Sequence, residues 1–260
     1  RQRGPHACTR ARCMSGLRPR ALVWQTVWPA MACAAQAGSI AWPGSGQALG
    51  WLQVLSLMLL AAGLARLTQA SFSRGREAHP LKRAAWFGGV FATAWLAGSF
   101  WWLYVSMHQV GGLPAPLAVL AVLALAAALA LYYAAASAVW VGLARGLVAE
   151  RPGWASALFA AVWPLAELMR GRWLTGFPWG AGGYAHVDGT LVAFAPWVGV
   201  YGMGAVAAWL AMRLALAGWR LRALKPLIGV GLAAWALQAF GPVFTTSAGT
   251  AQVQLLQANI

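Results

Sequence analysis

The chain has 260 residues, of which 61% are hydrophobic and only 9% are charged. Because a soluble domain of this length cannot bury so much apolar surface, the composition indicates a protein that lies in a lipid bilayer. The net charge of +15 does not indicate nucleic-acid binding, since the basic residues fall in clusters between apolar runs and do not form one continuous basic face.

The N-terminal residues are basic and contain the cysteines. Residues 1–20 are expected to form a cytoplasmic N-terminus that is partly non-native, because Arg1 is not a natural start and Met14 offers one. Cys8, Cys13 and Cys33 have neither zinc-ligand spacing nor an even count, so we expect free thiols, no metal site and no cofactor.

Seven apolar runs are long enough to cross a bilayer core, which takes roughly 17 to 25 helical residues each. They make up one predicted transmembrane domain over residues 21–241, with spans at 21–42, 48–67, 84–106, 114–145, 154–169, 191–216 and 224–241. A cytoplasmic N-terminus places 17 of the 19 Lys and Arg residues inside and only Arg170 and Arg172 outside. The positive-inside rule therefore favours this orientation.

A ladder of small residues recurs every fourth position along the run at 114–145, at Ala126, Ala130, Ala134, Ala138, Gly142 and Gly146. Such a stripe lets a neighbouring helix approach closely. In a segment so rich in alanine, chance recurrence is an equally good interpretation.

The tail at residues 242–260 changes in character, because it is polar and β-branched with Val253 and Leu255 at alternate positions. A lone strand is not stable. The tail is therefore expected to be the first strand of an outer-face domain that continues past Ile260.

The stretch ELMRGRWLTGFPWGAGGY combines charge, glycine and aromatic rings at the outer end of an apolar helix. Glu167 and Arg170 lie one helical turn apart, so each can neutralise a charge that would be costly alone in the membrane. Two interpretations remain open: a structural pair that clamps two helices, or part of a substrate site.

The loop after these residues carries Trp173, Phe177, Trp179 and Tyr184 among glycines and Pro178. Interfacial anchoring explains such rings. Alternatively, the Gly and Pro residues shape a bend that presents Trp179 and Phe177 to a lipid chain. His108 and His186 fall in outer loops without a neighbouring Ser or Cys, and we expect them to be solvated or hydrogen-bonded side chains.

These residues carry a family resemblance. ELMRGRWLTGFPWGAGGYAHVDG, FAPWVGVYG and FWWLYVSMHQVGGLPAPL resemble motifs of bacterial apolipoprotein N-acyltransferases, and the final VQLLQANI resembles the first strand of that family's nitrilase-like domain. The resemblance covers about residues 40–260.

The resemblance implies an all-α polytopic protein of the bacterial inner membrane, joined to an α/β nitrilase-like domain on the periplasmic side. It implies transfer of an acyl chain from a phospholipid donor to the amine of a diacylglyceryl cysteine in an apolipoprotein acceptor. It further implies a Cys nucleophile that forms a thioester, a Glu base and a Lys that stabilises the oxyanion.

None of these three catalytic residues is matched in residues 1–260, so the chain alone is expected to be inactive. By resemblance, Trp179 is tied to activity through contact with acyl chains, and Glu167, Arg170, Phe177, Pro178 and Tyr184 match the surrounding motif. The alternatives are a non-catalytic membrane scaffold or gene remnant and, with less support from the nearly uniform apolar spans, a transporter.

Overall fold

The computed structural model describes residues 31–73, 79–174, 176–218, 221, 224–242, 244–250 and 252–254. This part of the chain is helical and contains no β-strand, which confirms the all-α prediction. Residues 1–30, with Cys8 and Cys13, lie outside the described residues. So does most of the expected C-terminal strand, and residues 252–254 have no regular secondary structure.

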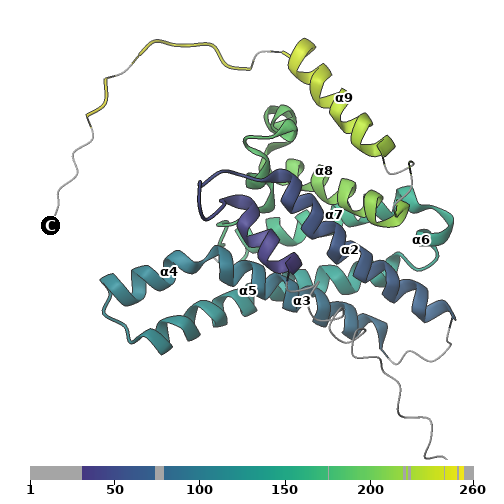
Figure 1. Cartoon of the computed structure of the whole chain (residues 1–260), viewed down its shortest axis with the longest axis horizontal. Helices are drawn as coiled ribbons and strands as arrows, with labels where there is room; N and C mark the ends of the chain where they lie inside the picture. The colour runs from purple at the N-terminus through teal and green to yellow at the C-terminus, as the bar shows by residue number, and fades with distance from the viewer. Residues whose placement is uncertain are drawn as a thin grey trace, which may run out of the picture.

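The described residues form six helices of 17 residues or more, together with a helix over residues 31–40 (Figure 1): α2 Gly50–Ser73, α3 Pro80–Ser99, α5 Ala115–Leu143, α7 Pro152–Arg172, α8 Ala195–Ala217 and α9 Leu224–Phe240. Short elements connect them: α4 Trp101–Val105, the π-helix η2 Ser106–Val110, α6 Leu147–Glu150, and the 3₁₀ helices η3 Gly182–His186 and η4 Thr190–Phe194. In α9 only Pro226 and Ala234 are buried.

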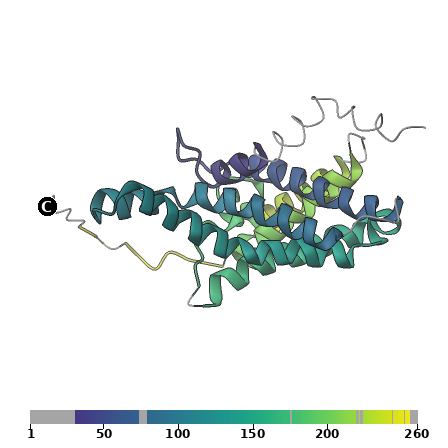
Figure 2. The same ribbon diagram turned by 90° about the horizontal axis from the view of Figure 1, so that it is seen from below.

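α3 and α5 lie side by side in both views and form the closest helix pair (Figure 2). Small residues permit the approach, because a Cβ on Gly88 would collide with the Ser137 side chain and one on Gly89 would lie 3.3 Å from Ala134. Ala126 and Ala130 are buried. The small-residue ladder therefore packs against another helix, as one of the two interpretations predicted.

Three helical stretches are long and apolar enough to cross a membrane, namely Gly50–Gln69, Ala115–Leu143 and Thr190–Ala217. A fourth span results if Pro80–Ser99 and Trp101–Val110, bent by 53° at their junction, count as one. α9 is apolar but has only 17 residues. The described part of the chain thus supports three or four crossings, and the seven predicted from the sequence remain a prediction.

A bend after Ser99 shapes the end of the bundle that lies next to the loop after α7. The sequence predicted one continuous span over 84–106, but the helix breaks at Phe100, which has φ −101° and ψ 16°. Phe100 is fully buried and its ring packs edge-on against Phe177, with centroids 4.9 Å apart. The break therefore ties the α3–α4 junction to the loop that follows α7.

Candidate functional site

The last turns of α7 bury both ionisable residues that the sequence singled out. Glu167 is 2% exposed and Arg170 is 1% exposed, and both lie on the face of α7 that also buries Trp163 and Ala166. Because uncompensated charge is costly at membrane depth, each side chain needs a polar partner.

Arg170 holds the loop after α7 to helix α5. Its Nε donates to the Tyr133 hydroxyl at 3.1 Å, and its Nη1 donates to the carbonyl oxygens of Phe177 and Trp179 at 2.7 and 2.8 Å. The Phe177 amide in turn donates to the Arg170 carbonyl at 2.9 Å. One guanidinium thus fixes the backbone on both sides of Pro178.

Gly176 makes this turn possible. Its φ of 75° lies in the left-handed region, and a Cβ there would collide with the Gly171 carbonyl. Such a position strongly favours glycine. The sequence predicted a Gly- and Pro-shaped bend here, and the structure shows which glycine requires it.

Glu167 accepts the amide hydrogen of Gly182, with both carboxylate oxygens 3.2 Å from that nitrogen. Gly182 is buried, and a Cβ on it would meet Gln53 and lie 3.0 Å from Glu167 Oε1. The carboxylate therefore anchors the start of η3, at a point where only a glycine permits the approach.

The two charged side chains do not hydrogen-bond to each other. Nε and Nη1 of Arg170 donate elsewhere, and Nη2 has no partner among the described residues. In place of the direct pair suggested by their spacing, each side chain binds the backbone of the loop, because residues 176–182 fold back over the end of α7. We call Glu167, Arg170 and Tyr133 the polar cradle.

His186 and Gln53 extend the buried polar structure from η3 to α2. His186 is 4% exposed, and its Nε2 lies 2.6 Å from Gln53 Oε1. Since that oxygen can only accept, Nε2 carries the proton. Burial lowers the pKa of His186 to about 4, so the imidazole is neutral near pH 7. His186 is therefore a hydrogen-bonded side chain, as the sequence predicted. The same prediction is confirmed for His108, whose Nδ1 lies 2.8 Å from the Leu113 carbonyl oxygen.

Trp179 stands on the outer side of this cradle and is 60% exposed. Its ring meets Trp102 edge-on, with centroids 5.8 Å apart. The left-handed φ of 74° at Gly180 brings the next backbone unit toward Ser99 and Phe100, since a Cβ there would lie 3.5 Å from Ser99. The cradle thus fixes the backbone of Trp179, while the indole ring of Trp179 remains exposed.

A large apolar groove opens beside Trp179. It has a volume of about 1570 Å³ and runs between the 31–46 segment and α3. Four tryptophans line it, Trp42, Trp101, Trp102 and Trp179. We call it the tryptophan groove, and its size exceeds the roughly 300 to 1,000 Å³ of common small-ligand sites.

The other residues predicted from the loop lie outside the lining of this groove. Phe177 is half-buried against Phe100, whereas Pro178 and Tyr184 are exposed. Sequence reasoning missed Tyr133 and Gln53, although each is a polar residue inside an apolar run, which is the signal that marks a buried hydrogen-bond partner.

The chain is similar to a family of known proteins over most of its length. The model of the family described as "Apolipoprotein N-acyltransferase N-terminal domain" matches residues 34–213. That range includes the polar cradle and every residue of the tryptophan groove apart from Met31 and Cys33.

Two curated relatives have the same name. An apolipoprotein N-acyltransferase of Verminephrobacter eiseniae is 49% identical over 92% of this chain and 45% of its own length. One of Ralstonia nicotianae is 46% identical over 81% of this chain and 38% of its own length. The chain therefore spans less than half the length of the relatives that it matches.

Proposed function

Because the chain belongs to the apolipoprotein N-acyltransferase family, we propose that it forms the membrane domain of an enzyme that transfers an acyl chain from a phospholipid to an apolipoprotein. The acceptor is the N-terminal amine of the diacylglyceryl cysteine. The observation that carries this proposal is the tryptophan groove, which places an exposed aromatic side chain over a buried, hydrogen-bonded support.

The groove suits a fatty acyl chain for two physical reasons. Its wall consists almost entirely of apolar side chains and small residues, such as Ala94 and Gly98, which leave room for a flexible chain. Its tryptophans supply rigid apolar area that needs little ordering upon binding. We propose that Trp179 and Trp102 hold the acyl chain at the mouth of the groove.

The polar cradle plays a positioning role in this proposal. Arg170 fixes the carbonyls of Phe177 and Trp179, and Glu167 fixes Gly182, so the loop keeps one conformation while lipids exchange. Phe177 attaches the loop to the α3–α4 junction, because its ring packs edge-on against Phe100. Pro178 restricts the backbone next to Trp179, and the exposed Tyr184 contacts the membrane interface.

We assign the covalent chemistry to a Cys, Glu and Lys of a nitrilase-like domain outside residues 1–260. The thiolate attacks the ester carbonyl of the phospholipid, which releases a lysophospholipid and leaves a thioester. The acceptor amine then attacks the thioester, which forms an amide and frees the thiol. Cys33, the only cysteine within the described residues, is buried in the helix over residues 31–40 and takes no part.

We also propose that the protein lies in the inner membrane with its N-terminus in the cytoplasm and the Trp179 loop on the periplasmic side. The distribution of basic residues supports this orientation. A cysteine introduced at the exposed position Asp188 should react with a membrane-impermeant maleimide in spheroplasts. Reaction only after cell lysis would contradict the orientation.

The test of the function is the substitution Trp179→Ala in the enzyme that the complete gene encodes. Lost burial of an aromatic ring against an acyl chain weakens binding by roughly 1.5 to 3 kcal/mol, so N-acylation of a model lipoprotein should fall by roughly 10- to 100-fold. The extent of N-acylation is measured by mass spectrometry of the lipoprotein N-terminus in a strain that depends on this enzyme.

Trp197→Ala is the matched control. Trp197 is also half-exposed and also meets an aromatic ring edge-on, that of Phe244, but it does not line the tryptophan groove. It should retain wild-type acylation. If Trp179→Ala inserts normally and acylates as fast as Trp197→Ala, Trp179 is only an interfacial anchor.

A further inference from the structure

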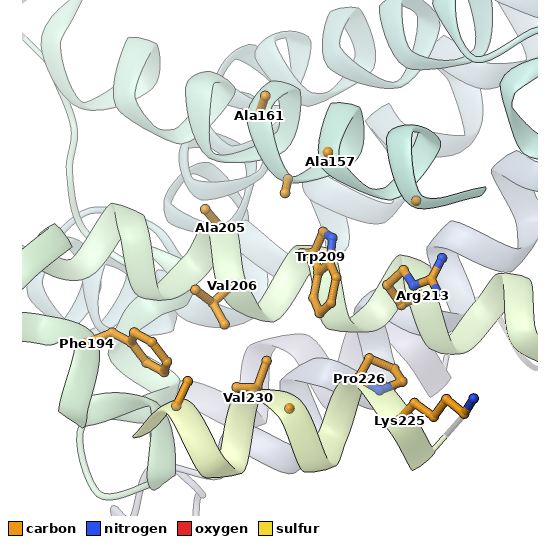
Figure 3. A pocket seen from close by; sticks show the side chains of 14 residues that line it. Ala157, Ala161, Phe194, Ala205, Val206, Trp209, Arg213, Lys225, Pro226 and Val230 are labelled. Carbon is orange, nitrogen blue, oxygen red and sulfur yellow. The ribbon is translucent and has the colours of Figure 1, made fainter. Parts of the chain in front are cut away.

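A second groove lies between α9 and the helices α7 and α8, away from Trp179 (Figure 3). Its volume is about 920 Å³. Its lining is apolar except at one end, where Arg213 of α8 and Lys225 of α9 lie (Figure 3). Gly153, at the start of α7, also lines the groove. Phe194 of η4 lies at the other end (Figure 3). We call it the cationic groove.

Arg213 and Lys225 are the two cations that line this groove. No hydrogen bond or ion pair holds Arg213 or Lys225 within the described part of the chain, and Lys225 is exposed while Arg213 is half-buried. The Arg213 guanidinium stands beside the N-terminus of α7, since a Cβ on Gly153 would lie 4.0 Å from its Nη1. The positive end of the α7 dipole therefore adds to the two side-chain charges.

The apolar part of the groove has a defined length. Along each helix the lining extends eight residues from the charged end: to Ala161 on α7, Ala205 on α8 and Ala233 on α9. At about 1.5 Å per residue this is about 12 Å, which is less than half of a ~30 Å hydrocarbon core.

Small residues keep this groove open. Ala157, Ala160 and Ala161 form the α7 wall, and a Cβ on Gly229 of α9 would meet no atom within 4 Å. α9 touches the bundle through η4 and α8, and only two of its residues are buried. Among the described residues, no side chain fills the space that Gly229 faces between α9 and α7.

We propose that the cationic groove binds an anionic phospholipid, with its phosphate between Arg213 and Lys225 and one acyl chain along the apolar wall toward Phe194. Charge complementarity selects this occupant, because an arginine and a lysine at the end of an apolar slot match a phosphate joined to an acyl chain. The lipid holds α9 against the bundle.

This lipid is distinct from the proposed acyl donor. The distribution of basic residues places Arg213 and Lys225 at the cytoplasmic leaflet, opposite to the Trp179 loop. A lipid here cannot reach a reaction on the periplasmic side. The inference does not depend on acyl transfer, and its failure would leave the proposed function unchanged.

The first experiment measures retention of phosphatidylglycerol by the protein in phosphatidylcholine nanodiscs, by native mass spectrometry. Each basic residue near an anionic headgroup contributes about 1 kcal/mol, so Arg213→Gln and Lys225→Gln should each weaken retention about fivefold. Arg145→Gln removes the same charge from an exposed site outside the groove and should have no effect. Equal loss in all three variants would overturn the proposal, because the binding would then be non-specific.

The second experiment fills the groove without altering charge. Gly229→Leu points a side chain into open space within the groove, and Gly231→Leu does so on α9 but outside its lining. Both raise helix propensity, so both should fold. Retention should fall at least fivefold in Gly229→Leu alone. If Gly229→Leu changes the oligomeric state and leaves lipid retention intact, a second copy of the chain occupies the groove and the proposal is wrong.

Discussion

The two grooves are built in opposite ways. The tryptophan groove adjoins a loop whose backbone is fixed by buried hydrogen bonds from Arg170 and Glu167, and it presents bulky rings. The cationic groove lies beside a helix with few buried residues, and its two cations, Arg213 and Lys225, have no hydrogen bond or ion pair among the described residues. The fixed backbone beside the tryptophan groove suits a substrate that must be positioned. The cationic groove suits a lipid that fills the space between helices.

Arg170→Met should break the first groove and spare the second, and it has the largest expected effect. It leaves the carbonyls of Phe177 and Trp179 and the Tyr133 hydroxyl without their donor. The loss should be about 3 to 5 kcal/mol, because each buried hydrogen bond to a charged group contributes about 1.5 to 3 kcal/mol. Thermal unfolding in detergent measures this loss of stability.

Arg172→Met is the control for this prediction, because Arg172 is exposed at the end of the same helix. It should change stability by no more than about 0.5 kcal/mol. Equal destabilisation by the two variants would mean that the loss of a positive charge, and not the cradle, is responsible. In the folded fraction, Arg170→Met should still retain phosphatidylglycerol.

The buried His186 predicts that the stability of the protein depends on pH. Its folded-state pKa of about 4 lies below the ordinary 6.5, so the unfolded chain binds more protons between these values, and stability falls as pH drops from 6.5 to 4. The loss reaches about 3 kcal/mol, since each pKa unit corresponds to about 1.4 kcal/mol. Unfolding measured across this pH range tests it.

His186→Gln keeps a donor for Gln53 but removes the titrating ring. Its stability should be nearly constant over the same pH window. A slope equal to that of the wild type would show that another group causes the acid sensitivity.

The smallest effect is expected from Trp102→Ala, which sharpens the account of the tryptophan groove. An edge-to-face ring pair contributes about 0.5 to 1.5 kcal/mol, so acylation should fall about 2- to 12-fold, less than with Trp179→Ala. Trp235→Ala, which breaks a similar pair with Phe240 on α9, should leave acylation unchanged. A loss larger than that of Trp179→Ala would make Trp102 the main aromatic contact.

The sequence predicted the helical class, the positions of most long helices and a bend shaped by glycine and proline between Glu167 and Trp179. These features depend on hydropathy and on unusual local composition, both of which are visible in one dimension. The same reasoning placed one straight span over 84–106. It missed the break at Phe100, because the contact between Phe100 and Phe177 joins residues far apart in sequence.

The sequence also did not predict the hydrogen-bond partners of the charged residues. Spacing indicated that Glu167 and Arg170 would pair, but the loop backbone competes successfully for both. Tyr133 reaches Arg170 across 37 positions of sequence, and Gln53 reaches His186 across 133. Such contacts follow from helix packing, which no local pattern encodes.

The most direct test of the central claim uses a phospholipid with a photoactivatable group at the end of one acyl chain, reconstituted with the protein. We predict that cross-links concentrate on the groove segments around Gly98–Trp102 and Trp179–Gly180, and that Trp179→Ala reduces them while Trp197→Ala does not. Labelling spread instead over the exposed leucines of α5, such as Leu120 and Leu131, and unaffected by Trp179→Ala, would contradict the claim that this groove receives acyl chains.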